Sequence, residues 1–176
     1  NLSSDFDICD DTQRMRIIKG IVGKFTKTEI EEFDRAISVL KLQEGNINKP
    51  SSDKKIDKFK TFYKEYQAQL REANVIDYDD ILIMSVKLLE NNPDILEYYQ
   101  NICEYIIEDE AQDSSGVQQR LIGLLSGKHK NLIRCGDINQ AITTTFSNAD
   151  VEGFRDFINT ADTKVEMNHS QRCTQD

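Results

Sequence analysis

The sequence predicts an α/β protein in which a helical part is followed by part of a parallel sheet flanked by helices. Two observations lead to this fold class. Up to about residue 100, apolar side chains recur at intervals of three and four, as they do on amphipathic helices. After residue 104, two short apolar runs flank a single helical segment, which is typical of a βαβ unit. An apolar content of 38% with only two prolines fits a globular, helix-rich chain.

Periodicity and capping signals divide the first part of the chain into separate helices. Capping-box spacing marks the start of the second helix, either at Thr26 with Glu29 or at Thr28 with Glu31. Residues 44–53 gather Gly, Asn, Pro and Ser and are expected to form a loop. The expected helices span residues 11–24, 26–43, 54–73 and 78–90, with a further one from Pro93 onward.

The helix expected over residues 54–73 has aromatic side chains along one face. Such a stripe could stack nucleic-acid bases, but strict helical spacing favours a buried face. We therefore interpret it as core. Its members are Ile56, Phe59, Phe62, Tyr63, Tyr66 and Leu70.

The second part of the chain carries the βαβ pattern. The runs "EYIIED" (104–109) and "LIRCGD" (132–137) are expected strands, and they should pair in parallel. The helix between them starts with a capping box of Ser115 and Gln118. Its buried face is expected to comprise Val117, Leu121, Leu124 and Leu125. "VEGFRDFI" (151–158) predicts another helix, and "KVEM" (164–167) predicts a third strand.

Acidic residues follow both of the paired strands. Asp109 and Glu110 come after the first, and Asp137 after the second. Ligands of parallel α/β sheets bind outside the carboxyl ends of the strands. Clustered carboxylates there are costly unless a cation lies among them, and Mg²⁺ with a phosphate substrate suits such ligands. Gly136 permits a tight turn, and Gln140 could reach a phosphate or an attacking water.

These runs resemble motifs of superfamily 1 DNA helicases of the UvrD/Rep/PcrA type. "EDEAQD" (108–113) is similar to their Walker B motif, (V)-D-E-x-Q-D, and "GDINQAI" (136–142) is similar to their motif III, G-D-x-x-Q-x-I. "IDYDDIL" (76–82) resembles the D-[FY]-x-D-[LI] stretch that precedes motif II. "VEMNHSQRC" (165–173) resembles a divergent motif IV, roughly L-x-x-N-Y-R-S.

The resemblance implies two structural units. Residues 1–77 would form a helical 1B-like subdomain, and residues 78–176 part of a RecA-like P-loop NTPase subdomain 1A with motifs II, III and IV. No G-x-x-x-x-G-K-[ST] run occurs in the sequence. We therefore expect a fragment without the P-loop half of 1A and without domains 2A and 2B. Such a fragment should not hydrolyse ATP by itself.

The resemblance also implies roles for individual residues. Asp109 would hold Mg²⁺, directly or through water, and Glu110 would act as the catalytic base. Gln140 would sense the γ-phosphate of ATP. Arg172 would contact that phosphate, although a competing register of motif IV places Ser170 at the arginine position. The implied nucleotide-binding set is Asp109, Gln112, Asp113, Gly136 and Asp137.

Motif III departs from the family pattern after residue 142. The family usually continues I-Y-x-F-R-G-A, with aromatic side chains that stack on single-stranded bases. Thr143 stands at the tyrosine position here, and one extra residue precedes Phe146. Both remain candidate DNA contacts, and Phe146 could equally belong to a core.

The implied parent is an ATP-dependent DNA helicase that uses Mg²⁺, moves on single-stranded DNA and unwinds duplexes, in repair or recombination. Its partners would be single-stranded DNA, duplex junctions and the remaining helicase domains. Three alternatives stay open. They are the helicase part of an AddA/RecB-type helicase-nuclease, a degenerate DNA- or protein-binding module without turnover, and a helical interaction domain with a solvated acidic strand end.

The net charge and the hydropathy of the sequence argue against two further classes of protein, those that coat DNA and those that span a membrane. The net charge of −9 argues against a protein that simply coats DNA, which would be basic. No apolar run is long enough for a membrane span, and the first residues lack the pattern of a signal peptide. A cytoplasmic, nucleoid-associated location without membrane contact is expected.

Overall fold

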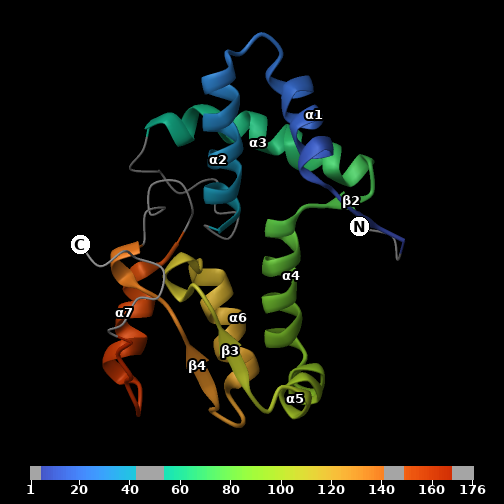
Figure 1. Ribbon diagram of the computed structural model, residues 1–176. Coiled ribbons are helices and arrows are strands. Elements are labelled where there is room, and N and C mark those ends of the chain that lie inside the picture. Colours follow the sequence, from blue (N-terminus) through green and yellow to red (C-terminus); the bar gives the residue numbers. More distant parts are fainter. Residues whose placement is uncertain (1–4, 43–53, 141–148, 168–176) are drawn as a thin grey trace, which may run out of the picture.

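A computed structural model describes residues 5–42, 54–140 and 149–167 of the chain. The described residues are mostly helical with two small pairs of parallel strands, which confirms the α/β class (Figure 1). The helices are α1 (Asp11–Val22), α2 (Lys27–Leu42), α3 (Lys54–Glu72), α4 (Tyr78–Asn91), α5 (Pro93–Ile102), α6 (Gly116–Ser126) and α7 (Val151–Thr160). The strands are β1 (Asp7–Ile8), β2 (Val75–Ile76), β3 (Ile106–Glu108) and β4 (Leu132–Arg134), and the 3₁₀ turns are η1 (Ala111–Asp113) and η2 (Ile138–Gln140).

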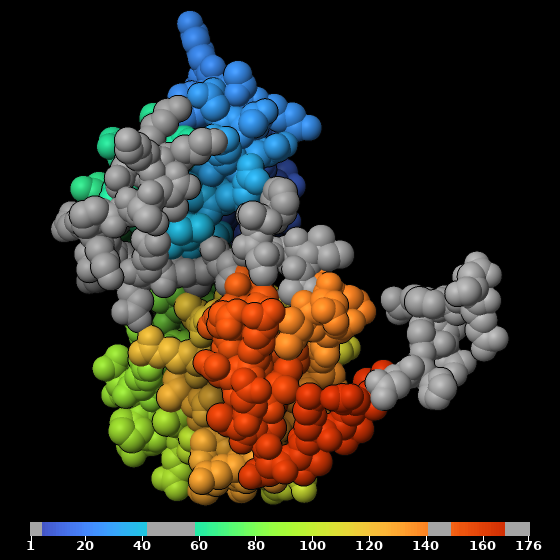
Figure 2. Space-filling model, turned by 90° about the vertical axis from the view of Figure 1, so that its left-hand side faces the viewer, coloured from blue at the N-terminus to red at the C-terminus, as the bar shows by residue number. Residues whose placement is uncertain are grey.

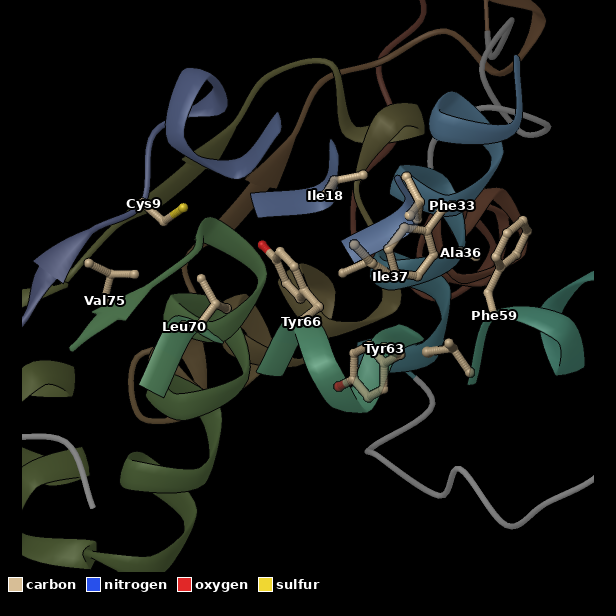
Figure 3. Packing of buried hydrophobic residues seen from close by; sticks show 12 residues of the cluster. Cys9, Ile18, Phe33, Ala36, Ile37, Phe59, Tyr63, Tyr66, Leu70 and Val75 are labelled. Carbon is tan, nitrogen blue, oxygen red and sulfur yellow. The ribbon is translucent and has the colours of Figure 1, made fainter. Parts of the chain in front are cut away.

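The main hydrophobic core lies among α1, α2 and α3 (Figure 3). The aromatic stripe of α3 belongs to this core, as predicted: Phe59 and Tyr66 are buried, and the ring of Phe59 lies 5.3 Å from that of Phe33 on α2. Phe62 contacts Phe25 edge to face at a centroid distance of 5.4 Å. These aromatic side chains are packed against one another and are not presented to bases in solution.

A pair of very short strands closes one end of this core. β1 and β2 pair in parallel, with Asp7 opposite Val75 and Ile8 opposite Ile76. These strands were not predicted from the sequence, because two residues are too few to show an alternating pattern. Val75 and Ile76 are buried, so the segment between α3 and α4 contributes to the core.

Two helix starts are as the capping residues predicted. The hydroxyl of Thr26 accepts a hydrogen bond from the amide of Glu29, and the carboxylate of Glu29 accepts one from the amide of Thr26. This selects Thr26 with Glu29 over the alternative pair. At α6, Ser115 and Gln118 form the same reciprocal box. Both boxes satisfy amide donors that a helix start leaves without partners.

The second part of the chain contains the predicted βαβ unit. β3 and β4 pair in parallel, with Ile106 opposite Leu132 and Glu108 opposite Arg134. Figure 1 shows the two strands side by side, with α6 between them in the chain and α7 after them. α4 packs against α6. In Figure 2, α7 covers much of one face of this part, and the N-terminal helices lie above it.

Two details of this part differ from prediction. The apolar side chains of α6 (Val117, Leu121, Leu124 and Leu125) are half-buried and not fully buried. Residues 164–167 do not form the expected third strand, and Val165 and Met167 are 81% and 86% exposed. A strand needs a neighbour for its backbone hydrogen bonds, and no described strand lies beside these residues.

A buried ionic network joins the helical part to the start of α4. The ammonium of Lys41 lies 2.6 Å from a carboxylate oxygen of Asp77 and 2.7 Å from one of Asp80. Arg14 donates to the other oxygen of Asp77 at 3.0 Å, and the hydroxyl of Tyr66 donates to that same oxygen at 2.8 Å. The side chains of Lys41 and Asp77 are each 1% exposed. The network therefore ties α1, α2 and α3 to the N-terminus of α4.

Asp77 lies at the predicted boundary between residues 1–77 and 78–176, and this division into two units stays a prediction.

Among the described residues, every helix is too short or too polar to span a membrane.

The network shifts the pKa values of its two acids in opposite directions. Burial favours the neutral form of Asp77, but the attraction of Lys41 and the hydrogen bonds from Lys41, the Asp80 amide and Tyr66 outweigh it, so its pKa is lowered. Burial raises the pKa of Asp80 despite the attraction of Lys41, and the charge of Asp77 adds to the increase. Asp77 thus contributes stability above its ordinary pKa of 3.8, and this is lost as the pH falls through its lowered pKa.

Replacing Lys41 tests this network. Lys41→Met removes the cation from the buried carboxylate of Asp77 and the half-buried carboxylate of Asp80, and we expect the free energy of unfolding at pH 7 to fall by about 3–5 kcal/mol. The loss should shrink as the pH falls through the raised pKa of Asp80, because protonation of Asp80 removes the uncompensated charge. Urea unfolding at several pH values measures both effects.

The control for this variant is Lys27→Met. Lys27 pairs with Glu31 on the surface, where its side chain is 93% exposed, so the loss should stay below about 1 kcal/mol. A Lys41→Met variant whose stability matches that of the control at pH 7 contradicts the account of the network.

Candidate functional site

The candidate site is built from the two loops that follow β3 and β4. The first is the acidic loop, defined here as residues 109–113. Its backbone leaves β3 through Glu110, which has left-handed dihedral angles, φ 51° and ψ 41°. The carboxylate of Asp109 accepts a hydrogen bond from the Glu110 amide at 3.0 Å. The Ala111 amide then donates to the carbonyl of Cys135 at 2.8 Å, which ties the loop to the end of β4.

The left-handed conformation of Glu110 is a local strain. It costs a residue with a side chain on the order of 1 kcal/mol, because Cβ approaches the following carbonyl oxygen. The turn nonetheless leads directly into η1, where Asp113 donates its amide to the carbonyl of Glu110 at 2.9 Å. The strained residue is the same one that the sequence analysis assigned as the catalytic base. Asp109 and Glu110 are both exposed to solvent.

The second loop holds Asp137 and Gln140 in contact with each other. One carboxylate oxygen of Asp137 accepts the Asn139 amide at 2.9 Å, and the other accepts the side-chain amide of Gln140 at 3.0 Å. The backbone amide of Gln140 also donates to the carbonyl of Asp137 at 2.9 Å. Asp137 therefore caps η2 and at the same time orients the side chain of Gln140, which remains exposed.

Gln112 joins the two loops. Its side chain is buried, and its amide nitrogen donates to the carboxylate of Glu110 at 2.7 Å. Its amide oxygen accepts the backbone amide of Asp137 at 3.0 Å. One side chain thus contacts the acid of the first loop and the backbone of the second. A displacement of either loop would break one of these hydrogen bonds, so the two loops are mechanically coupled.

Gly136 makes room for this bridge. A Cβ atom at this position would lie 2.5 Å from the side-chain oxygen of Gln112 and 2.9 Å from the ring of Phe154. Phe154 is buried and cannot move aside easily. The glycine is therefore required by space at the crossing of β4, Gln112 and α7. From the sequence alone, Gly136 was expected to permit a tight turn.

The structure brings together most of the residues that the sequence singled out. Contacts connect Glu110 with Gln112, Gln112 with Asp137, and Asp137 with Gln140. Asp109 contacts the backbone of its neighbour, and Asp113 lies exposed at the end of η1. Three predicted residues, Thr143, Phe146 and Arg172, lie outside the described residues.

Sequence reasoning missed the polar cluster beneath the acidic loop. Glu108 and Arg134, the last residues of β3 and β4, form an ion pair with side chains only 9% and 4% exposed. Ser114 donates its hydroxyl to the same carboxylate. One feature of the strand indicates that Glu108 is buried. Alternation along β3 places Glu108 on the same face as Ile106, which is half-buried, and on the opposite face from Ile107, which is 69% exposed.

The donor set of the acidic loop fits one kind of metal site. Among the described residues, no group of three or more His, Cys, Asp or Glu side chains could enclose a metal ion by itself. Mg²⁺ does not need such a cage, since it keeps several waters and uses one or two carboxylates together with phosphate oxygens. The exposed carboxylate of Asp109 meets that requirement.

Gly136→Ala tests the close packing at the centre of the site. The added methyl group must displace Gln112 or Phe154, and we expect the free energy of unfolding to fall by about 1–3 kcal/mol. Gly123→Ala is the matched control, because a Cβ on this residue of α6 meets nothing within 4 Å. The control should be stabilising by about 0.5–1 kcal/mol. Equal stability of the two variants in urea unfolding contradicts this packing.

Comparison with known proteins identifies the family of this chain. Residues 1–162 match the family described as the UvrD/REP helicase N-terminal domain. The chain is 35% identical over 148 residues to the ATP-dependent DNA helicase PcrA of Staphylococcus aureus (strain Mu50 / ATCC 700699), covering 80% of this chain and 20% of that protein. It is 32% identical over 145 residues to the ATP-dependent DNA helicase Rep of Buchnera aphidicola subsp. Baizongia pistaciae, covering 81% of this chain and 22% of that protein.

The chain thus spans about a fifth of the length of the curated relatives that it matches. The family match covers both the helical part and the strand-end loops, and it confirms the resemblance found in the motifs. The chain belongs to the UvrD/REP helicase N-terminal domain family.

Proposed function

We propose that this chain supplies the hydrolytic acids and the coupling loop of an ATP-dependent DNA helicase. The full-length protein would hydrolyse ATP, move along single-stranded DNA and unwind duplexes. The Gln112 bridge carries this proposal, because it links a strand-end acid to the loop that bears Gln140. Through this link, binding or hydrolysis of a nucleotide at the acids would change the position of the loop that bears Gln140.

Each acid of the loop has a distinct proposed role. The exposed carboxylate of Asp109 would hold Mg²⁺, whose bound form neutralises charge on the phosphates. Glu110 would accept a proton from the attacking water. Its carboxylate is already oriented by the amide of Gln112 at 2.7 Å, which leaves its second oxygen available for such a water.

Gln140 is proposed to sense the γ-phosphate. Its side-chain amide donates to Asp137 at 3.0 Å, and its carbonyl oxygen and second N–H remain available to a phosphate or a water. Arg172 is proposed to contact the same phosphate, since a planar guanidinium suits charge stabilisation in phosphoryl transfer. Asp113 is proposed to relay contacts toward neighbouring elements of the motor. Thr143 and Phe146 are proposed DNA contacts.

The helicase proposal is preferred to a binding module without turnover. Glu110 adopts a strained backbone conformation, and its side chain is held by a buried glutamine. A site that only displays negative charge needs neither feature. The AddA/RecB-type alternative is a helicase of the same class, and a nuclease domain in the full-length protein would distinguish it.

ATP turnover by the full-length protein tests this proposal. We expect hydrolysis that is stimulated by single-stranded DNA in the wild type and that falls by about 10²–10⁴-fold in Glu110→Gln. The glutamine keeps the size of the side chain but cannot take a proton from water. Steady-state hydrolysis with and without an oligonucleotide measures this effect.

Binding of the oligonucleotide by both proteins serves as the control for folding. DNA binding without any turnover in the wild type would favour the binding-module alternative. Unchanged turnover in Glu110→Gln would overturn the assignment of the base.

A further inference from the structure

The buried pair of Glu108 and Arg134 lies directly beneath the proposed nucleotide site. The two residues end β3 and β4 and stand opposite each other in the parallel register. The guanidinium Nε of Arg134 donates to the carboxylate of Glu108, and both side chains are more than 90% buried. Asp109 is the next residue along the chain, so the pair is one peptide unit from the acid proposed to hold Mg²⁺.

The carboxylate of Glu108 also closes the acidic loop across its base. One of its oxygens accepts from Arg134, and the other accepts from the hydroxyl of Ser114. Glu108 precedes residues 109–113 and Ser114 follows them, so both ends of the loop are bound to a single side chain. The carbonyl of Ser114 additionally accepts the amide of Asp150 at 2.8 Å, which fixes that end to the start of α7.

Arg134 is itself held by the surrounding helices. Its Nη1 donates to the side chain of Gln119 on α6 at 3.3 Å. Gln119 in turn donates to the carbonyl of Asp150 at 2.7 Å. The guanidinium lies 5.2 Å and 5.1 Å from the ring centroids of Phe154 and Phe157 on α7. The base of the acidic loop, formed by Glu108, Arg134 and Ser114, is therefore attached to α6, to α7 and to both strands.

Packing alone does not require charges at this place. The Walker B pattern that this chain resembles carries an optional Val where Glu108 stands, and apolar side chains are sufficient to fill a strand end. Buried ion pairs are often no more stable than apolar replacements of the same volume. In addition, the Nη2 of Arg134 has no hydrogen-bond partner among the residues that the structure describes. What the charged pair adds is an acceptor for Ser114.

Building on the proposed function, we propose that Glu108, Arg134 and Ser114 are positioning residues of the nucleotide site. They touch no reacting atom. They act through the backbone of the acidic loop, which places Asp109 and Glu110 at the end of β3. The strained backbone of Glu110 is held from one side by Gln112 and from the other by this closed base.

Ser114→Ala in the full-length protein is the direct test. It removes the hydroxyl that closes the loop and keeps the ion pair intact. Ser126→Ala is the matched control, since Ser126 is also a buried serine and donates one hydrogen bond, to the carbonyl of Gly123 at 3.4 Å. Ser114→Thr retains a hydroxyl and should restore the wild-type behaviour.

We expect kcat for ATP hydrolysis to fall by about tenfold to a hundredfold in Ser114→Ala, because a small displacement of catalytic groups lowers the rate by such factors. KM should change by a smaller factor than kcat, because the other groups that bind the nucleotide are untouched by the substitution. Hydrogen exchange should be at least about tenfold faster at the amides of Ala111 and Asp113 than in the control. Thermal unfolding of both serine variants shows whether global stability accounts for either change.

Unchanged kcat together with unchanged exchange in Ser114→Ala overturns the proposal. A Ser114→Thr variant that is folded yet as slow as Ser114→Ala also overturns it, because the hydroxyl would then not be the cause. If the wild type shows no ATP hydrolysis, the proposed function fails separately. Exchange at Ala111 and Asp113 still decides whether the base holds the loop.

Discussion

The parallel pairing of β3 with β4 is the constraint on which the candidate site depends. Its register brings the ends of the two strands to one edge, with Glu108 opposite Arg134. Only in this arrangement can Gln112, which follows the first strand, accept the amide of Asp137, which follows the second. Gly136 serves the same arrangement, because any Cβ there would collide with the side chain of Gln112.

The acids of the chain fall into two groups with different environments. Asp77 and Glu108 are buried and bound to Lys41 and Arg134, so their charges are compensated inside the fold. Asp109 and Glu110 are exposed to solvent. The carboxylates that follow the isoleucines of β3 therefore do not leave the strand as a single solvated cluster. The first, Glu108, is paired with Arg134 and Ser114, and the next two are exposed to solvent.

Much of the fold was predictable because it rests on local patterns. Helical periodicity located α1 to α4, and the aromatic stripe of α3 was correctly assigned to the core. The parallel βαβ unit followed from two apolar runs around one helix.

Other elements could not be predicted from local patterns. β1 and β2 were missed because two-residue strands show no periodicity. The strand expected at residues 164–167 was wrong because an apolar run cannot show whether a partner strand lies beside it. Candidate site residues could be proposed where they are near in sequence or belong to a motif, as for Asp109, Glu110 and Gln140, and their roles stay predictions. The Lys41–Asp77 pair, 36 positions apart, and the Glu108–Arg134 pair depend on tertiary packing, which no local pattern reports.

The central claim is that the two strand-end loops form one nucleotide site. Hydrogen exchange of the full-length protein, with and without a non-hydrolysable ATP analogue and Mg²⁺, tests it most directly. The account predicts that amides of residues 109–113 and of residues 137–140 become protected together, and only when nucleotide and Mg²⁺ are both present. Protection of one loop without the other, or of neither loop at saturating nucleotide, would contradict it.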